Sequence, residues 1–116
     1  MNSNSEMVRR LNEEIRVTAQ HLRELVYAAP TQWVWDSFGS AIAVEQLAET
    51  IEKIENHVKE VQKYCDDKYR EFTNALIGVM WAGLQTKNHE AILQATRQLI
   101  SIDLDFAREP FALKPG

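Results

Sequence analysis

The stretch VEQLAETIEKIENHVKEVQKYC, residues 44–65, decides the fold that the sequence predicts. Its apolar residues recur at alternating intervals of three and four positions, which places them along one side of an α-helix and is typical of a heptad seam. The seam consists of Val44, Leu47, Ile51, Ile54, Val58, Val61 and Cys65. A long helix of this kind needs other helices to cover its seam, so the sequence predicts an all-α fold, a small antiparallel bundle of three to four helices with this helix at its centre.

The residues before this stretch predict another helix. Ser3 and Glu6 have the spacing of a capping box, so we expect a helix to begin near residue 4 and to end before Pro30. Its apolar side is expected to follow the same alternating intervals, through Val8, Leu11, Ile15, Thr18, Leu22 and Leu25. The central helix then begins at about Ser40.

The chain after Cys65 leaves two alternatives open. No proline interrupts residues 31–109, so the central helix could continue, or it could break between Cys65 and Tyr69, where the pattern moves by one residue. The displaced pattern consists of Tyr69, Phe72, Leu76, Val79 and Gly83.

The next turn is predicted at residues 86–88, with Asn88 as the N-cap of a last helix. The apolar side of that helix consists of Ile92, Leu93, Thr96, Leu99 and Ile100. Residues 100–106 alternate between apolar and polar, as in a strand, but a strand would need a partner that the sequence does not provide. We interpret these residues as helix.

Residues 75–84, ALIGVMWAGL, are apolar around most of a helix's circumference. Such a helix must be enclosed on several sides, either at the centre of the bundle or in a subunit interface, and the second interpretation is favoured because each helix of a small bundle normally keeps one side in water. We therefore expect a homo-oligomer, with an interface made by Val44, Leu47, Ile51, Ile54, Val58, Val61, Leu76, Ile77, Met80 and Trp81.

The connection between the first two helices is unusually aromatic. Trp33, Trp35 and Phe38 lie where polar residues would be usual, and Trp is enriched among the anchors of protein interfaces. Either Trp33 and Phe38 cap the core, or the connection docks on a second protein with Trp35 as its anchor. The predicted partner-binding residues are Trp33, Trp35, Phe38, Phe111 and Leu113.

Two resemblances imply other functions. The aromatic turn loosely resembles that of small secreted helical hairpins marked by Trp-x-Gly, although Trp35 is followed by Asp36 and Ser37 instead. Arg16 and His21 have the Arg-x4-His spacing of a family of helical ribonuclease domains, in which a dimer brings both residues to RNA. The first resemblance covers only a turn and the second only two residues.

Other polar residues give no site of their own. Arg9, Arg16 and Arg23 form a stripe that could hold phosphates or carboxylates, but ion pairing within a solvated helix face explains most of it. His21-x-x-Glu24 and His57-x-x-Glu60 place His and Glu three apart beside the seams rather than in them. We expect no catalytic residue, metal or cofactor.

Composition limits the setting of the protein. The 116 residues carry a net charge of −4, which disfavours nucleic acid as a partner, and contain one cysteine, which fits a reducing cytoplasm. The longest apolar run, residues 75–84, is too short to cross a membrane. The sequence predicts a single domain over residues 1–109, a short irregular tail over 110–116, and a non-enzymatic protein–protein interaction module such as an adaptor, chaperone, inhibitor or assembly factor.

Overall fold

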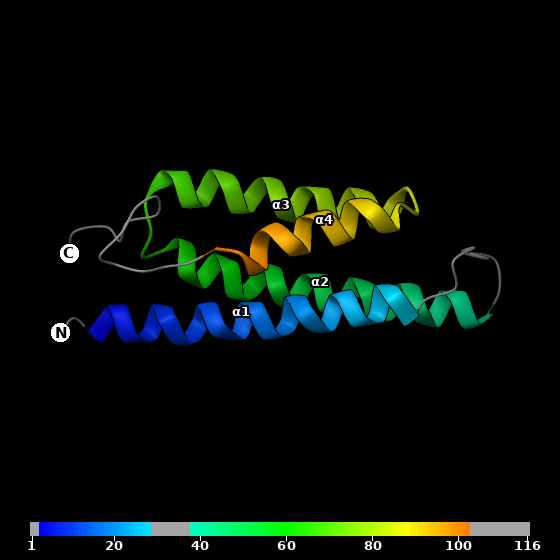
Figure 1. Cartoon of the computed structure of the whole chain (residues 1–116), viewed down its shortest axis with the longest axis horizontal. Helices are drawn as coiled ribbons and strands as arrows, with labels where there is room; N and C mark the ends of the chain where they lie inside the picture. The colour runs from blue at the N-terminus through cyan, green and yellow to red at the C-terminus, as the bar shows by residue number, and fades with distance from the viewer. Residues whose placement is uncertain (1–2, 29–37, 103–116) are drawn as a thin grey trace.

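Four helices form the protein in the computed structural model, which describes residues 3–28 and 38–102 (Figure 1). They are α1 (Ser3–Ala28), α2 (Phe38–Gln62), α3 (Asp67–Gln85) and α4 (His89–Ile100). The fold is all-helical, with the helices packed against one another, which confirms the predicted class. No helix in the described residues is long and apolar enough to cross a bilayer.

The helices alternate in direction along the chain (Figure 1). Within the described residues, α1 packs on α2 and α4, and α3 packs on the same two helices, whereas no Cα atoms of the diagonal pairs α1/α3 and α2/α4 lie within 8 Å of each other. Each helix therefore needs an apolar strip wide enough for two neighbours and keeps the rest of its surface in water.

The chain breaks after α2, as in the second of the two predicted alternatives, but a few residues earlier than the predicted stretch between Cys65 and Tyr69. The chain turns at residues 63–66, and Asp66 then caps α3 by accepting a hydrogen bond from the backbone amide of Tyr69 at 3.1 Å. A carboxylate at this position satisfies one of the backbone amides that the first helical turn leaves without a partner.

The predicted turn at residues 86–88 is confirmed, and it is tight. Lys87 has a left-handed φ of 60°, and the amide of Asn88 donates to the carbonyl of Gly83 at 2.8 Å, which together make a Schellman-type end of α3. The side chain of Asn88 accepts from the amide of Ala91 at 3.1 Å, so the predicted N-cap is also confirmed.

Gly83 permits the close approach of α4 to α3 behind this turn. A Cβ atom at residue 83 would lie 2.8 Å from Cγ1 of Ile92 and 3.2 Å from the backbone oxygen of Asn88. A side chain there would push the two helices apart.

The core contains most of the residues that the pattern predicted, with two corrections. In α2 every seam residue from Leu47 to Val61 is buried, and Cys65 is buried in the turn that follows. In α1 the buried line also contains Asn12, Ala19 and Val26, because α1 must face α4 as well as α2. In α3 the prediction was wrong for Phe72 and Val79, which are exposed.

The last helix buries the residues that were predicted, but it ends earlier than predicted. Ile92, Leu93, Thr96 and Leu99 are buried, and Ile100 packs partly against the core. The helix ends at Ile100, after which Ser101 lies in a turn and Ile102 is buried. The rest of the segment interpreted as helix, residues 103–106, lies outside the described part of the chain, as does the tail 110–116.

Candidate interaction surface

Most residues predicted for the oligomer interface lie inside a single chain. Leu47, Ile51, Ile54, Val58, Val61, Leu76, Ile77 and Met80 are at most 6% exposed, and Val44 and Trp81 are partly buried against the same core. The other helices of the same chain cover these side chains. Any surface for a second chain must therefore be sought at other residues.

The outward side of α3 is exposed and, from Phe72 onward, uncharged, whereas its first turns carry the exposed Lys68, Arg70 and Glu71. Residues 72–86 contain no Asp, Glu, Lys, Arg or His. Phe72 is 37% exposed and Val79 is 42% exposed, and smaller residues are exposed between and beside them. We call the following exposed residues the outer α3 face: Lys68, Phe72, Ala75, Gly78, Val79, Ala82 and Thr86.

The inward side of α3 fixes which residues point outward. Tyr69, Thr73, Leu76, Ile77, Met80 and Leu84 are buried against α2 and α4. Because both sides of this helix are apolar, the sequence pattern could not tell which would be covered. The structure makes the choice through the neighbouring helices.

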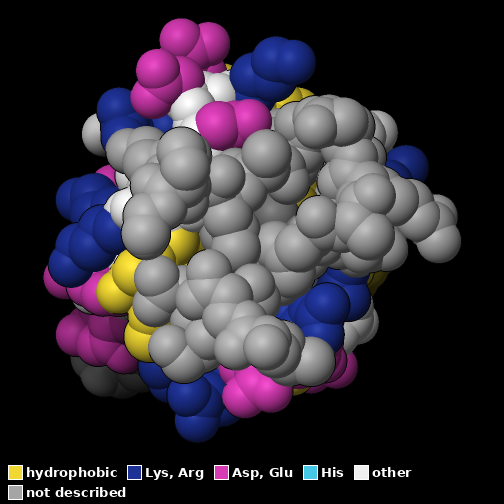
Figure 2. All heavy atoms as spheres, turned by 90° about the vertical axis from the view of Figure 1, so that its left-hand side faces the viewer, with side chains coloured by type: hydrophobic (Ala, Val, Ile, Leu, Met, Phe, Trp, Pro, Cys, Tyr) yellow, Lys and Arg dark blue, Asp and Glu magenta, His cyan; other side chains and the backbone are white. Residues whose placement is uncertain are grey.

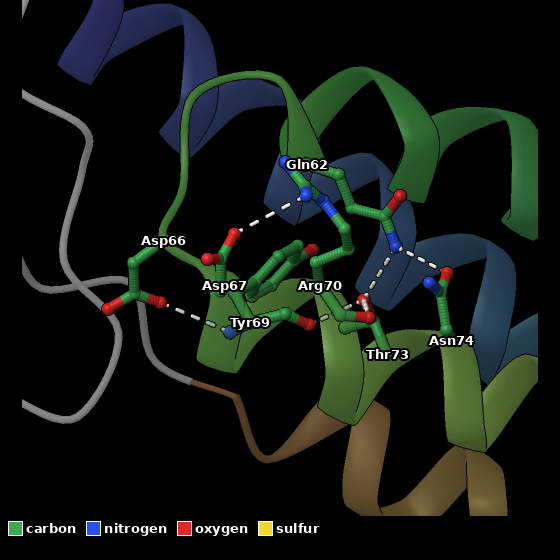
Figure 3. A network of polar contacts seen from close by, with 7 residues as sticks. All are labelled: Gln62, Asp66, Asp67, Tyr69, Arg70, Thr73 and Asn74. Atoms are coloured by element: carbon green, nitrogen blue, oxygen red, sulfur yellow. Dashed lines mark hydrogen bonds and ion pairs between the residues drawn. The ribbon is translucent and has the colours of Figure 1, made fainter.

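Polar contacts between α2 and α3 hold that orientation (Figure 3). The side-chain amide of Gln62 donates to Oγ1 of Thr73 at 2.9 Å and to Oδ1 of Asn74 at 2.8 Å. The buried Thr73 hydroxyl in turn donates to the carbonyl of Tyr69 at 2.7 Å. At the other end of the interface, Nε1 of Trp81 lies 3.4 Å from a carboxylate oxygen of Glu55. These contacts make rotation of α3 about its axis costly.

Arg16 and Arg23 have a role that the sequence did not predict. Nη2 of Arg16 donates to the carbonyl of Ile102 at 2.7 Å, and Nη1 of Arg23 donates to the carbonyl of Leu93 at 2.9 Å. Arg23 also donates to the buried hydroxyl of Thr96 at 3.2 Å. Two members of the arginine stripe therefore tie α1 to α4 and to the residues that follow it, instead of pointing into water.

Two open grooves flank the exposed Val17 of α1. Arg16 and His21 both line the groove between α1 and α4, together with Gln20 and Ile100. His21 itself is exposed, with Glu24 3.9 Å away on the same helix. In the groove between α1 and α2, His57 lies 3.8 Å from Glu14 of α1 rather than beside Glu60 of its own helix.

Titratable groups near the core have shifted pKa values. Burial raises the pKa of the Tyr69 hydroxyl, with a smaller contribution from the neighbouring Cys65. Burial lowers the pKa of His89, the first residue of α4. Both side chains have structural surroundings, and neither lies on the outer α3 face.

The remaining predicted sites can be placed only in part. Trp33, Trp35, Phe111 and Leu113 lie outside the described residues, and Phe38 begins α2 without a described side chain. Figure 2 views the end of the bundle where the chain begins and shows Lys and Arg side chains interspersed with Asp and Glu around its rim. Over residues 3–28 and 38–102, no group of three or more His, Cys, Asp or Glu side chains is arranged to hold a metal ion.

Comparison with known proteins adds no relative: no family model, curated protein or solved structure matches this chain.

Proposed function

We propose that the protein is a non-enzymatic interaction module, an adaptor, chaperone, inhibitor or assembly factor, that works as a helical homo-oligomer. The observation that carries this proposal is the outer α3 face, a surface without charge over residues 72–86 on a chain of which 26% is charged. Contiguous exposed apolar surface on a soluble protein commonly marks a site for another chain.

The rest of the bundle supports a docking role for this face. The inward side of α3 is already packed, and polar contacts from Gln62 of α2 to Thr73 and from Trp81 of α3 to Glu55 hold the helix in place. A rigid helix presents its exposed side chains without a large ordering cost on binding, which leaves more of the contact energy as affinity. Full burial of an exposed valine side chain stabilises by roughly 1.5–3 kcal/mol, and Val79, which is 42% exposed, can gain part of that in a contact.

The experiment is a concentration series of the wild-type protein, with its mass measured by light scattering or sedimentation equilibrium. We expect a species at least twice the 13.4 kDa of one chain at micromolar concentrations. A mass of 13.4 kDa throughout the series would refute the homo-oligomer.

The aromatic residues remain proposed contacts for a second, different protein: Trp33, Trp35, Phe38, Phe111 and Leu113. If Trp35 is an anchor, Trp35→Ala should keep its melting temperature and lose recovery of that protein from the native host. Loss of folding instead would make Trp35 a core residue. The single cysteine supports a cytoplasmic setting for the proposed interaction.

A second candidate function rests on the shared groove of Arg16 and His21 between α1 and α4. In a helical ribonuclease these two residues would act together on RNA. The guanidinium group of Arg16 is already occupied by the carbonyl of Ile102 at 2.7 Å, so this candidate has less support. RNA cleavage by the wild type that is abolished in His21→Ala would establish it.

A further inference from the structure

We propose that the chain that covers the outer α3 face is a second copy of this protein, with its α3 packed antiparallel to the first. This inference rests on the proposed function and adds the identity and orientation of the occupant.

The spacing of the outer α3 face allows this arrangement. Its central line consists of Lys68, Phe72, Ala75, Val79, Ala82 and Thr86. Successive members of this line are four, three, four, three and four residues apart. The spacing is therefore the same in both directions along the helix, about a point near Ile77. An antiparallel pair with a two-fold axis at that point brings each of these residues opposite another of the same line.

The sizes of the opposed residues are complementary. Phe72 meets Ala82 of the second copy, and Val79 meets Ala75, so that a large side chain faces a small one in each layer. Close packing of this kind fills space without steric strain. Gly78, where a Cβ atom would meet nothing within 4 Å, lies beside this line and leaves room for the two helices to approach.

Charge disfavours the parallel alternative. In a parallel pair each residue of the line meets its own copy, so Lys68 would face Lys68 across the interface, and the two alanine layers would be left underfilled. In the antiparallel pair Lys68 faces the uncharged Thr86. Like charges opposed at an interface are unfavourable, and an amine opposite a hydroxyl is not.

Charge also favours a second copy over an unrelated acidic or basic protein. Between Phe72 and Thr86 the face offers no charged group with which such a partner could pair. Residues 72–86 of a second copy are likewise uncharged, so the two stretches meet without an unpaired charge between them.

Cysteine cross-linking tests the orientation. Two variants of the full chain are prepared, one with Lys68→Cys and the other with Thr86→Cys. Both also carry Cys65→Ala, which removes the only native thiol. Both added positions are exposed and lie at the ends of the line, so the apolar residues stay intact. A disulfide needs Cα atoms within about 7 Å.

The antiparallel pair predicts a covalent dimer when the two variants are mixed and oxidised, and little when either is oxidised alone. Residue 68 of the two copies would be about 27 Å apart along the axis, at a rise of about 1.5 Å per residue. In the control mixture, Thr86→Cys is combined with Gln20→Cys, whose added cysteine lies at an exposed position on α1. This mixture should give only a background level of covalent dimer.

The outcomes separate the two proposals. Cross-linking of each variant with itself would overturn the antiparallel arrangement and leave self-association standing. Absence of cross-links in every sample would overturn the placement of a second copy on this face. The same result is expected if residues 103–116 of the same chain cover the face. The wild-type mass series decides independently whether the protein self-associates at all.

Discussion

Arg23 of α1 and Leu93 of α4 are joined across the bundle by a hydrogen bond of 2.9 Å from the guanidinium Nη1 to the backbone carbonyl oxygen. The same guanidinium group reaches Oγ1 of Thr96 and lies 5.8 Å from the centre of the Tyr27 ring. These polar contacts add to the apolar packing that positions α4, a helix of 12 residues, against the 26-residue α1.

Replacement of Arg23 should therefore destabilise the fold. We expect Arg23→Met to lower the free energy of unfolding by about 1–3 kcal/mol, because partly buried acceptors lose a charged donor. Chemical denaturation measures the loss. The matched control is Arg10→Met on the exposed side of α1, which should change stability by at most about 0.5 kcal/mol. Equal effects of the two substitutions would contradict the role given to Arg23.

The two glycines of α3 should respond in opposite directions to alanine. Gly78→Ala adds a methyl group in open space and should raise the free energy of unfolding by about 0.5–1 kcal/mol through helix propensity. Gly83→Ala places its Cβ 2.8 Å from Ile92 and should lower stability, since overpacking costs about 1–3 kcal/mol.

Thermal or urea unfolding of both glycine variants checks this pair. Both variants should be measured at a low protein concentration at which they have the same mass. Gly78 also borders the proposed contact, so a difference in association could otherwise change the measured stability. Stabilisation by both alanines would show that α3 and α4 do not approach closely at Gly83.

The left-handed Lys87 gives a third prediction. Lys87→Gly should unfold at a higher temperature than Lys87→Ala. Glycine adopts a φ of 60° without strain, whereas the Cβ atom of alanine is sterically strained in this conformation. Both variants lack the lysine side chain, so their difference isolates the backbone. We expect it to be about 1 kcal/mol. No difference would mean that residue 87 does not hold this conformation in solution.

The sequence was sufficient for the helices but not for how they are oriented about their axes. Asn88 could be recognised as an N-cap, and the seam residues of α2 as core, because both signals are local. The outward position of Val79 could not be predicted, because α3 is apolar on both sides and its neighbours decide which side is covered.

The roles of Arg16 and Arg23 escaped the sequence for a similar reason. Their spacing of seven residues places them on one side of a helix, but nothing in that spacing shows that carbonyl groups of α4 lie opposite. Asp66 could have been recognised, since an Asp just before a helical segment is a common N-cap.

The central claim is that the outer α3 face is where this protein associates, and Val79 tests it most directly. Sedimentation equilibrium of Val79→Glu should give the mass of one chain at concentrations where the wild type is larger, because a charge would be buried in the contact. The matched control is Val17→Glu, since Val17 is 62% exposed on α1 and outside the face. We predict that Val17→Glu keeps the wild-type mass and that both variants stay folded by circular dichroism. A folded Val79→Glu that associates as strongly as the wild type would contradict the claim.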